Sequence, residues 1–142
     1  MIVYTNVHLV KSEDLNHHDT LFAARGCAWI VEAGLTAAAC EHGNLDEVVM
    51  RTVSNLSFSK PVPKGTMLSF ESRVVQVGTS SITVYVRGVN AITGEQYIEA
   101  FIVYVTVHSD MSGKKAHGII LDETTDEEEL LLRKRAAQLL KR

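Results

Sequence analysis

One carboxylate stands alone in the most apolar stretch of the chain. Between Arg25 and Glu41 the residues are almost all Gly, Ala, Cys, Trp, Ile, Val and Leu, and the only carboxylate there is Glu32. A carboxylate in apolar surroundings must be paired with a donor or be neutral. Such a group can act as a general base or as a nucleophile. Glu32 is therefore either a catalytic group or a structural carboxylate that pairs with Arg25 or with strand backbone.

The cysteines and histidines predict neither a nucleophilic thiol nor a metal site. Cys27 and Cys40 are thirteen positions apart, about 20 Å on a helix, whereas a disulfide needs Cα atoms within about 7 Å. Their neighbours supply no base or positive field, so both are expected to be small buried hydrophobes in a reducing compartment. His17 and His18 complete no zinc-like ligand spacing and are expected at the surface.

The apolar run itself predicts a helix at the centre of the molecule. Ala and Leu favour helix, and the apolar positions from Leu21 to Glu41 do not alternate as in a half-buried strand. A helix that is apolar nearly all round is expected to be buried on every side. Asp19 or Thr20 suits the N-cap, and Gly43 can adopt the left-handed conformation that ends a helix.

Most of the remaining sequence predicts strands. Stretches rich in β-branched residues, several with apolar and polar residues in alternation, cover residues 2–10, 47–59, 67–77, 80–90 and 96–108. Gly78 and Thr93-Gly94 mark tight turns between them. The predicted order is one strand, one long helix and about four antiparallel strands.

A second helix is predicted over residues 124–142. Thr124 or Thr125 suits its N-cap. Its charged residues are expected to form a solvated face. An imperfect apolar side suited to docking consists of Leu131, Ala136, Leu139 and Leu140.

Composition limits the function classes. The chain has 142 residues, 46% hydrophobic and 22% charged, which is typical of one soluble globular domain. Its formal net charge of −3 argues against nucleic-acid partners. Residues 1–10 lack a signal-peptide pattern, and the central run carries Arg25 and Glu32, so we expect a cytoplasmic protein without a membrane partner.

The order of elements and four motifs resemble the hot-dog thioesterases, in particular their acyl-CoA hydrolase branch. The motifs are NHHDTLFAA at 16–24, WIVEAG at 29–34, FSKPVPKG at 58–65 and GTSSI at 78–82. The resemblance covers about residues 7–107 and implies an α+β hot-dog fold, in which a curved antiparallel sheet of about five strands wraps around a long central helix. We expect a hot-dog domain over 1–122 and a C-terminal amphipathic helix over 123–142, packed on it or extending from it.

The resemblance also implies site residues. Asn16 and Glu32 are the expected catalytic residues, and amides of Phe22, Ala23 and Ala24 would form an oxyanion hole at the helix N-terminus. The other expected substrate contacts are His17, Thr79, Ser80 and Ser81, while Lys60, Lys114 and Lys115 could meet coenzyme A phosphates.

Several positions depart from the family pattern. Asp19, Ala23 and Ala24 replace its glycines. Counted from Asn16, the usual mid-helix aspartate falls on Val31, and Glu32 lies one residue later, about 100° around the helix.

The resemblance implies hydrolysis of acyl-CoA to a free carboxylic acid and coenzyme A, with no metal or redox cofactor. It also implies edge-to-edge homodimers or trimers of dimers, with a site shared between the Asn16 loop of one chain and the Glu32 helix of the other. The alternative is a non-catalytic acyl-CoA binding or sensing protein, which Val31, Asp19 and the missing glycine pair favour. A hot-dog dehydratase fits worse, because no histidine lies near the helix start beyond His17 and His18.

Overall fold

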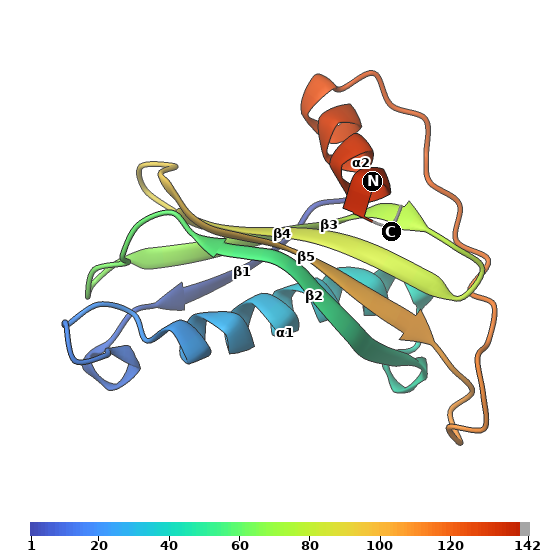
Figure 1. The fold of residues 1–142 in the computed structure, drawn as a ribbon, viewed down its shortest axis with the longest axis horizontal. Helices are drawn as coiled ribbons and strands as arrows, with labels where there is room; N and C mark the ends of the chain where they lie inside the picture. The colour runs from blue at the N-terminus through green and yellow to red at the C-terminus, as the bar shows by residue number, and fades with distance from the viewer. Residues whose placement is uncertain (140–142) are drawn as a thin grey trace.

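A five-stranded antiparallel sheet curves around one long helix in the computed structural model, which describes residues 1–139 (Figure 1). The strands are β1 (Tyr4–Leu9), β2 (Val48–Phe58), β3 (Met67–Val77), β4 (Ser81–Asn90) and β5 (Gln96–Thr106). Their order across the sheet is β1-β3-β4-β5-β2. The central helix α1 (Ala23–His42) lies on one face of the sheet, and the second helix α2 (Glu127–Leu139) lies on the other. The predicted hot-dog fold is confirmed.

Every predicted strand boundary lies within two residues of the observed one. The side chains that alternate along β3, such as Leu68, Phe70 and Val74, are fully buried in the core between the sheet and α1. Alternation is a reliable signal here because one face of each strand must pack against the central helix.

Helix α1 begins two residues later than predicted. Its N-cap is Phe22, whose side chain makes no capping hydrogen bond. The prediction of Asp19 or Thr20 as the N-cap is wrong, because Asp19 has a positive φ of 60° and Thr20 is bridged to Pro63. The backbone therefore reaches the helix only at Ala23. The predicted end is confirmed, since Gly43 has a φ of 88°.

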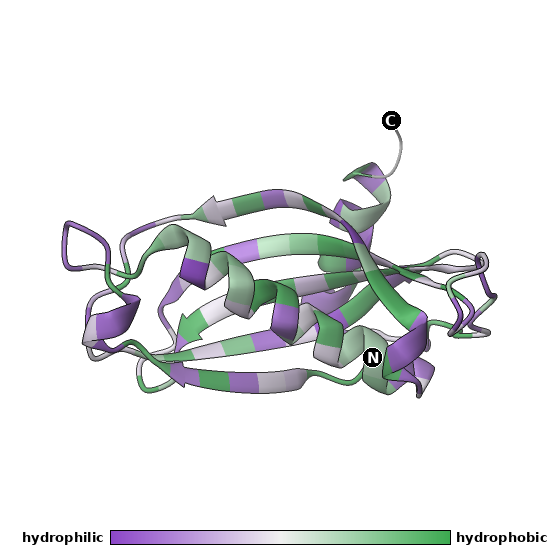
Figure 2. Cartoon of the chain, turned by 90° about the horizontal axis from the view of Figure 1, so that it is seen from below, coloured by the Kyte–Doolittle hydropathy of each residue, from purple (hydrophilic) through white to green (hydrophobic). Residues whose placement is uncertain are grey.

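The sheet covers only one side of α1. Ala24, Ala28 and Glu32 are exposed on the other side, so the expectation of burial on every side is wrong for one chain. Figure 2 shows α1 crossing a single face of the sheet. Cys27 is half-buried, but Cys40 is exposed, which corrects the expectation that both are buried. The buried face of α1 consists of Gly26, Trp29, Ile30, Ala33, Gly34, Ala37 and Ala38.

Helix α2 docks on the outer face of the sheet through Leu132 and Ala136, whereas Leu131 is exposed, contrary to the prediction. The predicted threonine caps are also wrong: the carboxylate of Asp126 accepts a hydrogen bond from the amide of Glu129 at 2.9 Å. The part of the predicted helix from residue 140 to 142 lies outside the described residues.

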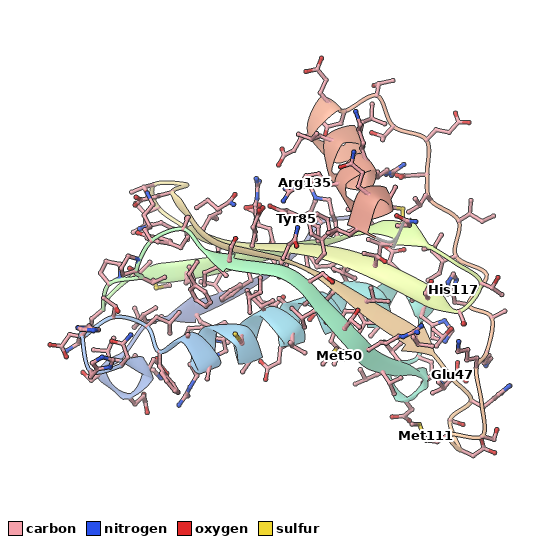
Figure 3. All side chains as sticks on the ribbon, in the orientation of Figure 1. Glu47, Met50, Tyr85, Met111, His117 and Arg135 are labelled. Carbon is pink, nitrogen blue, oxygen red and sulfur yellow. The ribbon has the colours of Figure 1, made fainter. Side chains whose placement is uncertain are left out.

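The prediction that the charges of α2 form a solvated face is wrong in part, because several of them bond to the sheet. Glu129 is buried and accepts hydrogen bonds from Arg73 at 3.1 Å and Arg133 at 2.8 Å. Arg135 pairs with Glu99 at 2.8 Å and lies near Tyr85, as Figure 3 shows. Ion pairs thus join α2 to the sheet. The division of the chain into a hot-dog domain over 1–122 and a C-terminal helix segment stays a prediction.

The two edge strands of the sheet are β1 and β2. β2 is exposed over most of its length and shifts register against β5 twice, between Met50 and Thr52 and between Ser54 and Ser57. Asn55, inside the second shift, has a positive φ of 52°. The large apolar side chains that β2 exposes are Met50, Val53, Leu56 and Phe58.

Within residues 1–139, no helix combines the length and the hydropathy that crossing a membrane requires.

Candidate active site

Asn16 organises the loop that leads into α1, which we call the Asn16 loop (residues 11–22). Its side-chain oxygen accepts hydrogen bonds from the amides of His18 at 2.8 Å and Thr20 at 3.2 Å. Its amide nitrogen donates to the hydroxyl of Thr20 at 3.1 Å. Asn16 therefore shapes the backbone beside the helix N-terminus, and its catalytic role stays a prediction. His17 and His18 are both exposed, as expected.

The first turn of α1 has two unused amides. The amide of Phe22 donates to the Asp14 carbonyl at 2.8 Å, and the amides of Arg25 and Gly26 donate to the Phe22 carbonyl. The amides of Ala23 and Ala24 have no acceptor among the described residues. Both side chains are exposed. At the positive end of a helix dipole, two such donors can hold an oxyanion, whereas the Phe22 amide is already engaged.

Asp14 supports this arrangement and was not predicted. Its carboxylate is buried, accepts a hydrogen bond from the Lys11 amide at 2.9 Å, and lies 3.3 Å from the guanidinium of Arg25. Its carbonyl also holds the Phe22 amide. No sequence pattern distinguishes a buried aspartate in a polar loop from an exposed one, so sequence reasoning could not find it.

Glu32 is exposed on α1, and its carboxylate has no hydrogen-bond or ion-pair partner within residues 1–139. The predicted structural alternative, a pair with Arg25, is wrong, because Arg25 pairs with Asp14. Glu32 lies nine positions after Ala23, so the carboxylate is about 14 Å along the axis from the free amides. One chain therefore cannot bring both to the same carbonyl group.

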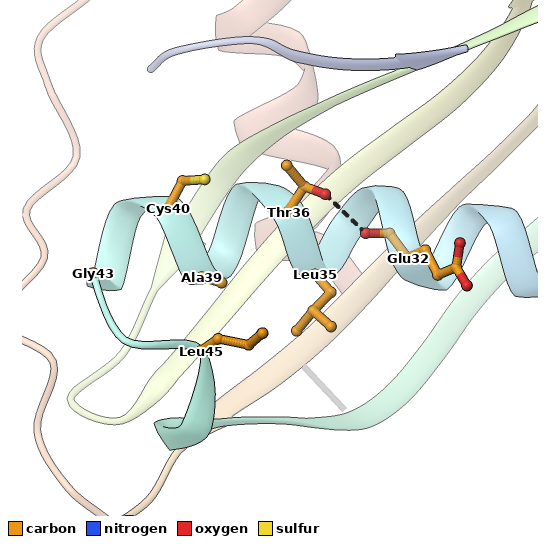
Figure 4. Close-up of a pocket in the computed structure, with 7 residues that line it drawn as sticks. All are labelled: Glu32, Leu35, Thr36, Ala39, Cys40, Gly43 and Leu45. Carbon is orange, nitrogen blue, oxygen red and sulfur yellow. Dashed lines mark hydrogen bonds between the residues drawn. The ribbon is translucent and has the colours of Figure 1, made fainter. Parts of the chain in front are cut away.

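An apolar cavity of about 520 Å³ begins at Glu32 and follows α1 towards its C-terminus. Figure 4 shows the side chains of Leu35 and Leu45 directed towards each other along its wall. Its remaining lining residues are Thr36, Ala39, Cys40 and Gly43.

A second cavity, of about 410 Å³, lies at the other end of α1 beside the Asn16 loop. Asn16, Ala23, Phe58 and Lys60 are among its lining residues, and it shares none with the first cavity. Ala23 and Glu32 thus line two different cavities.

A family model for the thioesterase superfamily matches residues 18–96 of the chain. This range spans α1 and all strands except β1 and most of β5. The chain belongs to the thioesterase superfamily.

Similar proteins place this thioesterase among the acyl-CoA hydrolases. It is 32% identical over 130 residues to an uncharacterized acyl-CoA thioester hydrolase, YkhA, of Bacillus subtilis, covering 88% of this chain and 72% of that protein. A hexameric acyl-CoA thioesterase is 27% identical with a TM-score of 0.78, covering 96% of this chain and 86% of that one. An acyl-CoA hydrolase from Staphylococcus aureus, solved with butyryl coenzyme A, is 24% identical with a TM-score of 0.81, covering 96% and 80%.

The turn between β3 and β4 lies far from the Asn16 loop of the same thioesterase chain. The loop meets the sheet where Thr20 pairs with Pro63, before the start of β3, whereas Thr79–Ser81 follow its end. The eleven residues of β3 span about 35 Å. Carbonyls of this turn accept hydrogen bonds from Thr106 and His117. The turn therefore lies at the end of the molecule to which the Glu32 cavity extends.

Two of the three candidate lysines are engaged by carboxylates. Lys60 pairs with Glu95, and Lys115 pairs with Glu47 at 2.7 Å. Hydrogen bonds from Lys115 and from His42 lower the pKa of Glu47 below its usual range. Lys114 is exposed and has no carboxylate partner in the described part of this thioesterase. The buried Glu47 cluster, which joins α1 to the loop after β5, was also not predicted.

Proposed function

We propose that this thioesterase hydrolyses acyl-CoA to a free acid and coenzyme A through Glu32. The carboxylate takes a proton from water, and the resulting hydroxide attacks the thioester carbonyl. The amides of Ala23 and Ala24 stabilise the oxyanion until the C–S bond breaks and the thiolate of coenzyme A leaves. This route includes no metal and no cofactor besides the coenzyme A of the substrate.

The observation that carries this proposal is that the Glu32 carboxylate is exposed and unpaired within residues 1–139. Buried carboxylates such as Asp14, Glu47 and Glu129 are held by cations or backbone amides. Glu32 is exposed at the mouth of an apolar cavity and has no partner in residues 1–139. A carboxylate that bonds to no group in residues 1–139 is free to orient a water, and the adjacent apolar wall suits an acyl group.

We further propose that the site forms between two chains. The Asn16 loop and the free amides lie at one end of the molecule, and the Glu32 cavity opens towards the other. Edge-to-edge pairing of β2 with β2 of a second copy around a twofold axis would exchange these ends. It would place the Asn16 loop of one chain near Glu32 and Thr79–Ser81 of its partner. The exposed apolar side chains of β2, among them Met50 (Figure 3), support such a contact.

A trimer of such dimers is our proposal for the complete assembly, supported by a similar acyl-CoA thioesterase that is hexameric. We also propose that the remaining predicted contact residues, among them His17, Phe22 and Ser80, bind the acyl-CoA substrate. The cytoplasmic location expected from the sequence stays a prediction.

A second function, acyl-CoA binding without turnover, has one specific observation in its favour. In the staphylococcal hydrolase, two solved variants replace an asparagine and an aspartate that are fifteen residues apart. The same separation from Asn16 reaches Val31, which has no acid. If hydrolysis needs a carboxylate at position 31 and Glu32 cannot replace it, this chain lacks the essential group and the sensing alternative follows.

Release of free thiol from a panel of acyl-CoAs tests the proposal. The native protein should release thiol, and Glu32→Gln should lower the rate about 10²–10⁴-fold while the protein stays folded and assembled. Saturable acyl-CoA binding without thiol release would establish the sensor instead. A native rate in Glu32→Gln would remove Glu32 from the mechanism.

Hybrid oligomers test the shared site separately. Asn16→Ala and Glu32→Ala proteins, each nearly inactive, should regain part of the activity after they are dissociated and reassociated together. Hybrids that form, as shown by differential tagging, but remain inactive would reject sharing.

A further inference from the structure

Three hydroxyl groups contact the turn of α1 that carries Glu32. The Val31 carbonyl accepts a hydrogen bond from the Tyr104 hydroxyl at 2.7 Å, and the Ala33 carbonyl accepts one from Ser72 at 2.9 Å. Between them, the Glu32 carbonyl accepts one from Thr36 at 3.1 Å (Figure 4). Three successive helix carbonyls therefore each have a side-chain donor, in addition to the amides that a helix provides.

Two of these donors tie the helix to the sheet from separate strands. Ser72 is on β3 and Tyr104 is on β5, with β4 between them, and both residues are fully buried. The carbonyls that they hold are those immediately before and after Glu32. Bonds from two different strands restrict both sliding and rotation of this turn, whereas packing of small side chains alone would restrict them less.

Gly34 makes the tyrosine contact possible. A Cβ atom at this position would lie 2.5 Å from the Tyr104 hydroxyl oxygen and 3.1 Å from Cδ1 of Ile102. Glycine in a helix interior costs about 1 kcal/mol relative to alanine, and Gly34 lies well inside a helix of 20 residues. The close approach of the hydroxyl explains why the helix contains a glycine one turn from Val31.

We propose that Tyr104, Ser72 and Thr36 are positioning residues for the Glu32 carboxylate. They hold the turn on which it stands, so that the carboxylate meets the water and the partner's oxyanion donors in one fixed geometry. Catalytic rates respond steeply to such geometry, since a misplacement of about 1 Å can cost about 10²-fold. The inference rests on the proposed function of Glu32.

Variants that remove only the oxygen atoms test this role in the full-length chain. Tyr104→Phe and Ser72→Ala should each lower kcat about 10-fold for the acyl-CoA that the native protein hydrolyses fastest, with KM changed less than about twofold. Tyr85→Phe is the matched control, because the Tyr85 hydroxyl bonds to Glu99 on the face of the sheet away from α1 (Figure 3). It should leave kcat unchanged.

A double-mutant cycle separates positioning from a general effect on the fold. In a Glu32→Gln background, Tyr104→Phe should cause no further loss of the residual activity, because the group that it positions is already gone. The same fold-loss in both backgrounds would overturn the inference, and so would native kcat in folded Tyr104→Phe and Ser72→Ala. If those buried variants fail to fold, Thr36→Val provides a second comparison through the Glu32 carbonyl, with KM measured as well because Thr36 also lines the apolar cavity. Failure of the proposed function is distinguishable, since Glu32→Gln itself would then keep the native rate.

Discussion

Val31 and Glu32 are neighbours in sequence but differ in surroundings. Val31 is partly buried and packs against the core between α1 and the sheet, while Glu32 is exposed beside the apolar cavity. A rotation of about 100° separates their side chains. Glu32 thus occupies the more accessible of the two positions.

We expect Val31→Asp not to restore the activity lost in Glu32→Gln. A carboxylate at position 31 would leave apolar contacts and face the core, which should also lower the free energy of unfolding by about 1–3 kcal/mol. Thiol release and urea denaturation of the single and double variants measure both effects. Recovery of activity in the double variant would move the catalytic position to residue 31.

Gly34→Ala gives a second residue-scale prediction in which two effects have opposite signs. Helix propensity alone predicts stabilisation by about 1 kcal/mol. The new Cβ would lie 2.5 Å from the Tyr104 hydroxyl oxygen, so the tyrosine or the helix must shift and a buried hydrogen bond is lost. We expect a net destabilisation of about 2 kcal/mol.

Urea denaturation measures this change. Tyr104→Phe removes the clashing oxygen, so the double variant should be more stable than Gly34→Ala alone. A Gly34→Ala protein more stable than native would show that the close approach is not real.

At the scale of elements, α2 is held to the sheet by a buried carboxylate. Burial alone would raise the pKa of Glu129, but hydrogen bonds from Arg73 and Arg133 outweigh it, and the pKa is lowered from its ordinary value of 4.5. A lowered pKa means that the stabilisation is complete above pH 4.5 and is lost as the pH falls through the lower value. Docking of α2 should therefore weaken in acid.

We expect the amide chemical shifts of α2 to report undocking below pH 4.5, before the shifts of the sheet change. Glu129→Gln should weaken docking at neutral pH, because it leaves Arg73 without its buried partner. It should also reduce this acid transition but not remove it, because Arg135 lowers the pKa of Glu99 as well. Glu123→Gln, an exposed carboxylate outside these ion pairs, serves as the control. Undocking with the same pH dependence in Glu129→Gln would contradict the assignment.

The sequence predicts elements better than their docking. β-Branched residues, together with alternation in several stretches, located all five strands, and the apolar run located α1, because these patterns record which side chains must face the core. The start of α1 was misplaced since Thr20 is a good cap by type but bonds to Asn16 instead. The docked face of α2 was misjudged because Leu131 and Leu132 are chemically alike, and only the sheet decides which is buried.

The candidate site was predictable in part for a similar reason. Residue types and motif order led to Asn16 and Glu32 as candidates and to the N-terminal end of the central helix as a candidate oxyanion site. The buried Asp14 and the hydroxyl of Tyr104 gave no local signal, because their partners are distant in sequence or lie on another strand.

At the scale of the whole molecule, the open β2 edge should determine both assembly and activity. Val53→Lys would place a charge among the exposed apolar side chains of β2. We expect it to shift the protein towards monomers in sedimentation velocity and to lower thiol release at least 10-fold, since the two halves of the proposed site would separate.

Ile92→Lys, in a loop and 84% exposed, is the matched control and should change neither property. Monomeric Val53→Lys protein with native activity would show that one chain holds a complete site.

The irregular path of β2 has a consequence for which chains can join this edge. A regular strand added to β2 would meet the displaced backbone around Asn55 and leave amides or carbonyls unpaired there. A second copy of β2 carries the same displacement, and in the proposed dimer a twofold axis through that region would place the two displacements opposite each other. An exposed strand is ordinarily a hazard, open to any chain with free backbone. In the proposed dimer, this irregularity would favour pairing of β2 with an identical strand over mixed oligomers or open-ended aggregates.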